Sequence, residues 1–373
     1  MNSNPWVERA WQQITDKLET TSERIGAGFP HAAKEGTYDL MSPTWWTAGF
    51  WPGILWLVYR DTGSDKYKAL AQECERKLDE VLNRYYPIDH DAGFMWTLTS
   101  IASYKLTQDE ESKRRALIAA SHLAGRFNMK GQFIRAWNGK DQGKTGWAII
   151  DCMMNLPLLY WASDVTEDPR FKHIAAAHAD MVLREFVRPD GSTYHIVTFD
   201  PETGERTGAR GGQGYAEESA WSRGNAWALY GLALSYLHTR EERFLQAAKR
   251  VAHFFLANLP EDHVPHWDFR APVSADEETP RDTSAGAIAA SGLLELAQLV
   301  DPAEARLYQD GGTSILRSLY EKYGAWGKPE EGMLVKGTGH APAKQNIHVS
   351  LIYGDYYFVE GIAKLRGRKE LFW

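Results

Sequence analysis

Six segments with few charges and many glycine and aromatic residues recur along this chain, and they constrain its fold more than any other feature. They lie at 46–56, 91–96, 145–155, 219–227, 283–292 and 352–361. Charged stretches with apolar residues at helical spacing separate them, at 66–84, 108–127, 169–187, 241–257 and 302–321. The repeats are about 45 to 75 residues apart, which suits one helix pair plus a variable loop in each.

This alternation predicts an all-α fold. A helix that is apolar on all sides lies inside a protein, whereas a helix with one polar face lies outside. Six inner and about six outer helices predict an (α/α)6 barrel, with residues 1–373 forming a single catalytic domain. An open α-solenoid is the alternative. Aromatic and glycine residues crowd the starts of the inner helices, which favours a closed ring with a pocket at one end.

Residues 190–215 break the helical pattern with many glycines and strand-like alternation. A long segment with little helix in a helical protein is often functional. We expect this loop or short-strand segment to lie over the pocket.

Composition narrows the function. The chain has 42 Lys+Arg against 49 Asp+Glu, a net charge of −7, so it lacks the basic character typical of nucleic-acid binding. It also has 15 Trp, 17 Tyr and 14 Phe, whose flat faces suit sugars although most of them are expected in the core. The uncharged stretch 40–59 is broken by prolines and glycines, which predicts a buried loop plus helix and not a membrane span.

The remaining features of composition point to the cytoplasm. Two cysteines make no disulfide framework, and the N-terminus lacks the pattern of a secretory signal. No metal-binding or nucleotide-binding motif is present, so the sequence predicts neither a metal nor a cofactor.

Two carboxylates are the main candidates for chemistry. Asp151 stands in the apolar run Trp147–Met154, where burial would raise its pKa and make it a proton donor near neutral pH. A helix cap or a partner of an arginine is an equal alternative for Asp151. Asp91 begins an inner segment, where an N-cap is the ordinary role. Both fall in the inner set, so a closed ring can bring them to one pocket, as glycoside cleavage requires.

Two further side chains suit an anionic ligand. Arg223 lies between Trp221 and Trp227 and could hold a carboxylate by paired hydrogen bonds. It could instead neutralise Asp151 or Asp355. His195 could contact the same ligand, although a lone histidine is more often structural.

Taken together, these segments resemble those of the unsaturated glucuronyl hydrolases, glycoside hydrolase family 88. The matching stretches run in family order from about residue 28 to the C-terminus. They are 46–56, 90–94, 149–159, 194–201, 221–227 and 354–357. The resemblance implies an (α/α)6 barrel that removes a 4-deoxy-4,5-unsaturated uronic acid from the non-reducing end of lyase-generated oligosaccharides. It implies no cofactor, and no nucleic-acid or membrane partner.

The resemblance also implies roles for individual residues. Asp151 would protonate C4 of the C4=C5 double bond and then take a proton from the water that adds at C5, while Asp91 assists. The substrate-binding residues implied are Trp46, His90, Trp137, His195, Gln213, Trp221, Arg223 and Trp227. Lys336, His340 and Lys344 are candidates for an outer subsite, with a solvated loop as the alternative.

The chain also departs from the family pattern. Gly212 stands where a chondroitin-active relative has a histidine, and Ala48 replaces an acidic residue. These changes leave the parent polysaccharide, its sulfation and the second sugar open, and the oligomeric state is equally unreadable.

Three rival functions remain at this stage. A conventional inverting glycosidase and an N-acylglucosamine epimerase-like isomerase share the predicted fold. An α-helical scaffold or sugar-binding module is the non-enzyme alternative.

Overall fold

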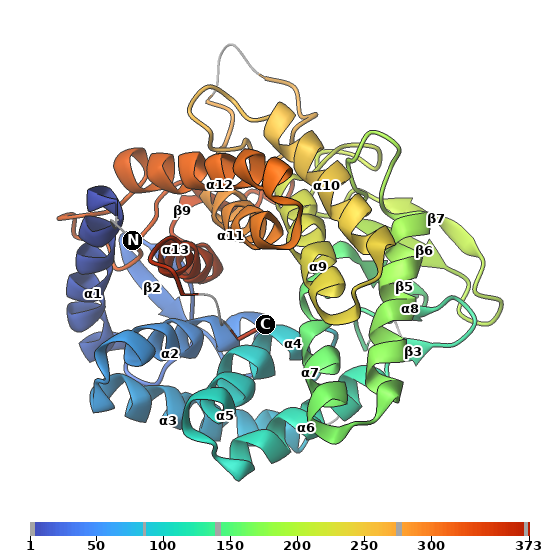
Figure 1. The fold of residues 1–373 in the computed structure, drawn as a ribbon, viewed down its shortest axis with the longest axis horizontal. Coiled ribbons are helices and arrows are strands. Elements are labelled where there is room, and N and C mark those ends of the chain that lie inside the picture. Colours follow the sequence, from blue (N-terminus) through green and yellow to red (C-terminus); the bar gives the residue numbers. More distant parts are fainter. Residues whose placement is uncertain (1–3, 85–86, 139–142, 274–277, 369–371) are drawn as a thin grey trace.

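The computed structural model describes residues 4–84, 87–138, 143–273, 278–368 and 372–373. Within them, helices form two concentric rings (Figure 1). The inner helices are apolar over most of their surface, and α9 is buried from Ser222 to Ser235. They are α2 (Phe50–Thr62), α4 and α5 (Ala92–Trp96, Ala102–Thr107), α7 (Pro157–Thr166), α9 (Ser222–Thr239), α11 (Thr283–Leu299) and α13 (Ile352–Leu365).

The outer helices bury one face each, as their amphipathic sequences predict. In α10, for example, the buried positions include Phe244, Ala248, Val251 and Phe255, which recur at helical spacing. The outer set consists of α1 (Pro5–Ile25), α3 (Asp65–Leu82), α6 (Glu110–Ala124), α8 (Pro169–Glu185), α10 (Glu242–Ala257) and α12 (Pro302–Lys322).

The ring closes because the last inner helix, α13, packs against both α2 and α11. The (α/α)6 barrel is therefore confirmed, and the open solenoid is excluded. None of the described helices is both long enough and apolar enough to cross a bilayer. The uncharged stretch is a loop followed by the buried helix α2, as predicted.

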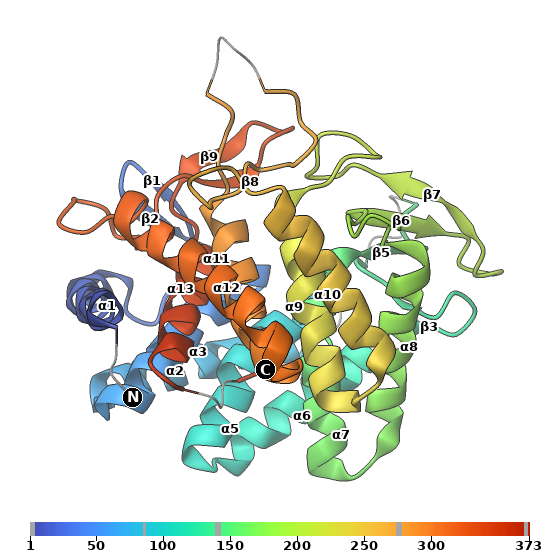
Figure 2. The same cartoon turned by 45° about the horizontal axis from the view of Figure 1, so that its top comes forward.

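Short antiparallel strands gather at one end of the barrel (Figure 2). They form the pairs β1 (Pro30–Lys34) with β2 (Thr37–Leu40), β3 (Phe127–Asn128) with β4 (Phe133–Ile134), and β8 (Gly337–His340) with β9 (Gln345–Val349). A three-stranded sheet has the order β5 (Trp147–Ile149), β6 (Ile196–Phe199), β7 (Arg206–Arg210). The inner helices begin at this end, which is the open end of the barrel.

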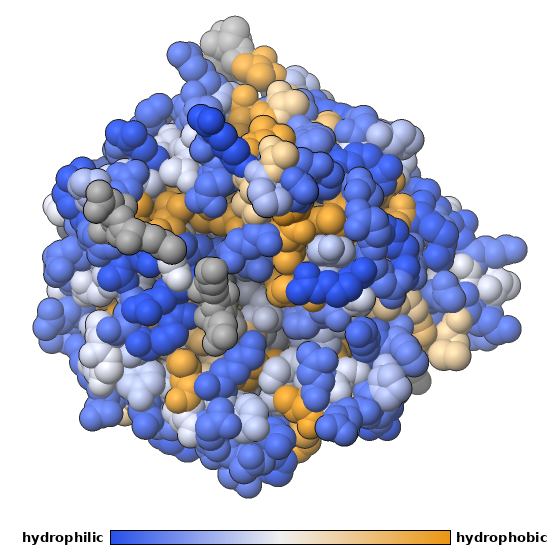
Figure 3. Space-filling view, in the orientation of Figure 1, coloured by the Kyte–Doolittle hydropathy of each residue, from blue (hydrophilic) through white to orange (hydrophobic). Residues whose placement is uncertain are grey.

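The C-terminal residue Trp373 packs into the opposite end of the barrel. Trp373 stacks on Tyr357 with ring centroids 6.0 Å apart, and its indole nitrogen donates to Glu360 at 2.7 Å. The carboxylate of buried Glu360 also accepts from Tyr230 and Tyr356. Figure 3 views the molecule from this end, where a largely hydrophilic surface is crossed by a band of apolar residues.

Candidate active site

A cavity of about 330 Å³ lies at the open end of the barrel. Every site residue predicted from the sequence lines it, namely Trp46, His90, Asp91, Trp137, Asp151, His195, Gln213, Trp221, Arg223 and Trp227. Four larger hollows in the described part of the chain, of about 480 to 690 Å³, contain none of these residues. The chemistry of the lining, and not its size, identifies the candidate site.

Asp151 stands in the 3₁₀ turn Ile150–Met154, between β5 and α7. The pairing of Ile149 with Ile196 and the hydrogen bond from the Ile150 amide to the His195 carbonyl at 3.0 Å fix this turn against the next strand. The Oδ1 atom of Asp151 is buried and accepts no hydrogen bond from the described residues. Burial raises the pKa of Asp151 to about 8, and the nearby Asp91 contributes to this increase.

Asp91 directly precedes α4, yet its side chain does not cap that helix. It is 8% exposed, and burial raises its pKa to about 7. Its Oδ1 accepts a 3.4 Å hydrogen bond from the Asn155 amide, which also donates to the Asp151 carbonyl at 3.4 Å. Of the two carboxyl groups, Asp151 has the higher pKa.

Asn155 and Gly93 bring the two aspartates together. The Asn155 Oδ1 accepts from the Phe94 amide at 2.7 Å, so one buried side chain joins the turn of Asp151 to the first turn of α4. A Cβ at Gly93 would lie 2.2 Å from the Asn155 Cα. Only a glycine permits this approach, and the sequence analysis did not single out Asn155.

Arg223 is buried, and most of its donors are already used. One terminal nitrogen contacts Asp282 and donates to the Thr338 carbonyl at 2.7 Å. The other donates to Gln213 Oε1 and to the Gly339 carbonyl, both at 2.7 Å. Arg223 therefore brings a positive charge to the cavity, but both of its terminal nitrogens already have partners, so it offers no free pair of N–H groups to a substrate carboxylate. Its ion-pair partner is Asp282, and neither Asp151 nor Asp355 takes that position.

His195 is neutral in this setting, because burial lowers its pKa to about 3. Its Nδ1 accepts from the backbone amide of Gln213 at 2.9 Å, although the Gly211 carbonyl also lies 3.1 Å from it. A nitrogen that accepts from an amide carries no proton, so we assign the proton to Nε2. The ring packs on Trp221 with centroids 4.3 Å apart.

Gly212 explains one departure from the family pattern. Its φ is +58°, and a Cβ there would lie 2.2 Å from His195 Nδ1. A histidine at this position would need a different backbone. The 190–215 segment as a whole does not cover the cavity, because its β6–β7 hairpin extends to the side and only residues at its two ends line the pocket (Figure 2).

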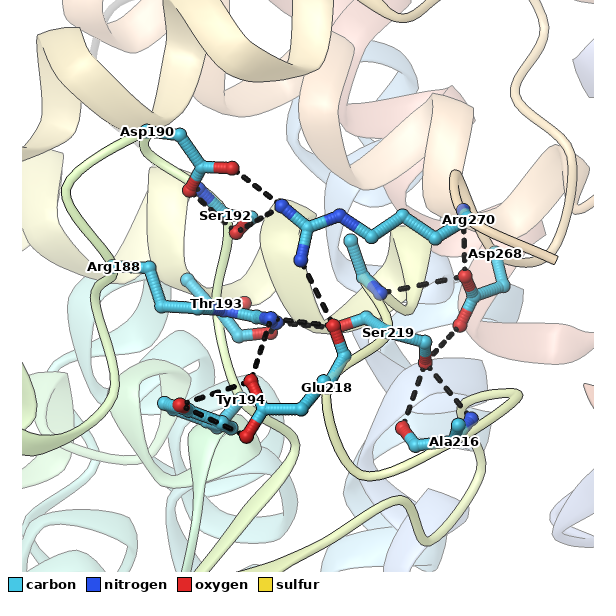
Figure 4. A network of polar contacts seen from close by, with 11 residues as sticks. Arg188, Asp190, Ser192, Thr193, Tyr194, Ala216, Glu218, Ser219, Asp268 and Arg270 are labelled. Atoms are coloured by element: carbon cyan, nitrogen blue, oxygen red, sulfur yellow. Dashed lines mark hydrogen bonds and ion pairs between the residues drawn. The ribbon is translucent and has the colours of Figure 1, made fainter.

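A polar network fixes those ends (Figure 4). Arg188 and Arg270 both donate to the Glu218 carbonyl, at 2.6 and 2.8 Å, and Arg188 also donates to the Thr193 carbonyl at 2.8 Å. Asp268 accepts from the Ser219 hydroxyl at 2.7 Å. The network thus anchors the chain just before His195 and just before Trp221. Thr193 and Ser219 lie in segments that the sequence analysis marked, but Arg188, Glu218 and Arg270 do not.

Other lining residues were not among the site residues predicted from the sequence. His31 comes from β1, Trp45 precedes the 3₁₀ turn Trp46–Gly49, Tyr353 begins α13, and Gln345 and Asn346 come from β9. Of the three outer-subsite candidates, His340 lines the cavity, whereas Lys336 and Lys344 do not. Lys336 instead pairs with Glu278 at 2.5 Å. No cluster of three or more His, Cys, Asp or Glu side chains able to hold a metal ion occurs within the described ranges.

The geometry agrees with comparisons to known proteins. Residues 21–357 match the model of Glycosyl Hydrolase Family 88. An unsaturated glucuronyl hydrolase of Bacillus sp. (strain GL1) is 38% identical over 97% of this chain and 98% of the relative. An unsaturated chondroitin disaccharide hydrolase of Streptococcus pyogenes serotype M1 is 37% identical over 89% of this chain and 84% of the relative.

Solved structures extend the likeness to the fold. The crystal structure of the unsaturated glucuronyl hydrolase from Bacillus sp. GL1 matches with a TM-score of 0.93 and 37% identity, covering 98% of this chain and 99% of the other. An unsaturated glucuronyl hydrolase specific for heparin matches with a TM-score of 0.89 and 31% identity, covering 97% of each chain.

Proposed function

The chain belongs to Glycosyl Hydrolase Family 88, and from this premise we propose that it releases the terminal 4-deoxy-4,5-unsaturated uronic acid from lyase-generated oligosaccharides. The observation that carries this proposal is the pair of buried carboxyl groups, Asp91 and Asp151, facing one cavity. Relatives with full-length similarity are named for this activity, and one from Streptococcus agalactiae was crystallised with dGlcA-GalNAc6S.

The pKa order supports a division of labour between the two carboxyls. Asp151, with a pKa of about 8, holds its proton at neutral pH and donates it to C4 of the double bond. The electron pair of the double bond forms the new C4–H bond, which leaves a cation shared by C5 and the ring oxygen. Asp91, with a pKa of about 7, is partly ionised at neutral pH and stabilises that charge.

The second half of the reaction uses Asp151 as a base. Its carboxylate takes a proton from the water that adds to C5, which regenerates the acid and leaves a hemiketal. The hemiketal opens to a ketone, the glycosidic bond breaks, and the remaining sugar leaves as an alcohol. Asn155 is the residue that keeps Asp91 directed at the reacting centre. The scheme needs no metal or organic cofactor, which remains part of the proposal.

The charge of the cavity suits an anionic substrate. Arg223 is one cation in the lining, and the raised pKa values of the two aspartates reduce the negative charge beside it. A cavity lined by ionised acids alone would repel a uronate. Trp221 and Trp227 supply flat apolar surfaces for the sugar.

The rival functions fit less well. An epimerase needs histidines as its acid and base, but burial lowers the pKa of His90 to about 4 and that of His195 to about 3. At neutral pH these imidazoles are neutral, so neither carries the additional, acidic proton that a general acid donates. An inverting glycosidase also uses one protonated and one ionised carboxyl, but it acts on saturated linkages, so the absorbance assay below distinguishes it from the proposed hydration. A binding module has no use for an unpaired carboxyl group with a raised pKa.

A direct test follows the near-ultraviolet absorbance of lyase-made unsaturated disaccharides. Hydration removes the conjugated double bond, so the wild type should abolish the absorbance. Asp151→Asn, which keeps the shape but loses the proton, should be at least about 10³-fold slower with unchanged folding. A wild type that leaves a broad disaccharide panel unchanged would refute the proposed reaction.

Two further expectations, on cellular location and on domain organisation, belong to the same proposal. We propose a cytoplasmic location, which the free, buried Cys74 and Cys152 support because they form no structural disulfide. We also propose that the chain acts as one catalytic domain, since a single large core connects the helices of both rings.

A further inference from the structure

The rim of the cavity carries an aromatic residue that the reaction does not use. Trp45 lines the cavity and is 40% exposed, whereas its neighbour Trp46 packs against Phe50, Phe94 and Tyr353. Within the described residues, Trp45 makes one ring contact, with His31 at 5.5 Å and an interplanar angle of 76°. Much of its indole surface therefore faces solvent beside the pocket.

The backbone holds Trp45 in place. Its amide donates to the Ser42 carbonyl at 2.9 Å, and its carbonyl accepts from the Ala48 amide at 3.0 Å. A large, rigid aromatic side chain loses little conformational entropy when it binds a ligand. An exposed tryptophan on a fixed turn is a suitable platform for the apolar face of a sugar.

Two amide side chains share this rim. Gln345 and Asn346, on β9, line the cavity, and neither side chain makes a hydrogen bond to the described part of the chain. Strand β9 follows on to Ser350, whose carbonyl accepts from Ala33 of β1 at 2.9 Å. Strand β1, which carries His31, and the β8–β9 hairpin, which carries Gln345 and Asn346, are thus held side by side at the same end of the barrel (Figure 2).

The backbone of the hairpin is unusual at this point. Lys344, Asn346 and His348 all have positive φ, at 54°, 52° and 60°. Non-glycine residues in this conformation cost free energy and are concentrated at functional sites. On the other strand, the Gly339 carbonyl accepts from Arg223, which ties the hairpin to the active site.

The aromatic residues form three levels of depth. Trp221 and Trp227 are buried beside the aspartates, Trp46 and Trp137 are half-buried, and Trp45 is exposed. A cavity of about 330 Å³ is near the small end of the range for ligand pockets, about 300 to 1,000 Å³. A cavity of this size holds the terminal uronic acid and the second sugar at most, so a third sugar must lie across the rim.

We propose that Trp45, with Gln345 and Asn346, forms a subsite for the third sugar of an unsaturated oligosaccharide. This inference rests on the proposed function and adds a substrate length to it. The indole packs on the apolar face of the sugar, and the amides exchange hydrogen bonds with its hydroxyl groups. A disaccharide ends before this subsite, whereas a tetrasaccharide fills it.

The test compares unsaturated di- and tetrasaccharides made by one lyase from one polymer, chosen as the polymer whose disaccharide the wild type hydrolyses fastest. The measured quantity is kcat/KM for the tetrasaccharide divided by kcat/KM for the disaccharide. Trp45→Ala should lower this ratio about 3- to 10-fold, mainly through KM for the tetrasaccharide. Its kcat/KM for the disaccharide should fall less than its kcat/KM for the tetrasaccharide, because the uronate site is intact.

Matched variants isolate the cause. Trp45→Phe keeps a flat face and should retain most of the ratio. Asn346→Gly suits the positive φ and should lower the ratio in the same direction as Trp45→Ala. Leu307→Ala, which removes another exposed apolar side chain far from the cavity lining, should leave it unchanged.

The outcomes separate the subsite from the reaction. A selective loss on the tetrasaccharide supports the subsite. An equal loss on both lengths, or an unchanged ratio, overturns it while leaving the proposed reaction intact. A wild type inactive on every disaccharide and tetrasaccharide removes the reaction, and the subsite with it.

Discussion

Replacing Gly93 with alanine should separate the two aspartates without touching either of them. The new Cβ would lie 2.2 Å from the Asn155 Cα and 2.5 Å from its carbonyl oxygen, whereas ordinary contact begins at 3.4 Å. The start of α4 must therefore move about 1.2 Å away from the turn that carries Asp151. A displacement of about 1 Å in a catalytic geometry can cost about 10²-fold in rate. We expect kcat to fall by that order.

The same substitution should also cost about 1 to 3 kcal/mol of folding free energy, as overpacking of a core does. The assay is therefore run on both properties, with absorbance loss for kcat and urea unfolding for stability. Gly208→Ala is the matched control, because the nearest atom to a Cβ there is a Thr198 hydroxyl at 3.6 Å. A Gly93→Ala enzyme that is folded and retains full kcat would refute the claim that this close approach sets the dyad.

Two further predictions concern the charge of the site. Because Asp151 acts as a proton donor and its pKa is raised to about 8, kcat/KM should fall about tenfold per pH unit above that value, which a pH–rate profile measures. Asp282→Asn should leave the buried Arg223 without its counter-ion and cost about 3 kcal/mol in urea unfolding. The unbalanced cation should also favour the ionised form of Asp151, so the alkaline limb of the profile moves to lower pH; a limb that stays in place would contradict this coupling.

Periodicity was sufficient to predict the two rings of helices, because burial on all sides and burial on one side leave different traces in a sequence. The polar faces of α3, α6, α8, α10 and α12 and the apolar inner segments are local properties of each stretch. Periodicity did not predict the secondary structure of the segment around Asp151. It is a short strand and a 3₁₀ turn, and the inner helix begins only at Pro157. Its apolar composition alone does not distinguish these structures.

The sequence likewise predicted one part of the candidate site and not the other. Residue type and resemblance sufficed to select Asp91, Asp151 and Arg223, and all three line one cavity. Their partners, however, lie far away in the chain. Asp282 is 59 residues from Arg223, and Asn155 is 64 residues from Asp91. No local pattern encodes such a pairing, so the environments that set the pKa values come only from the tertiary structure.

By itself, the sequence determined which helices face inward, which residue types carry acid–base chemistry, and which family the chain resembles. These follow from hydrophobic periodicity and from short motifs, both of which can be read within one segment. Ring closure decided the rest. It placed the exposed Trp45 and the amides of β9 on one rim, and it left the buried Oδ1 atom of Asp151 without a hydrogen-bond partner among the described residues. The physical reason is that desolvation and contact depend on neighbours brought in from elsewhere in the chain.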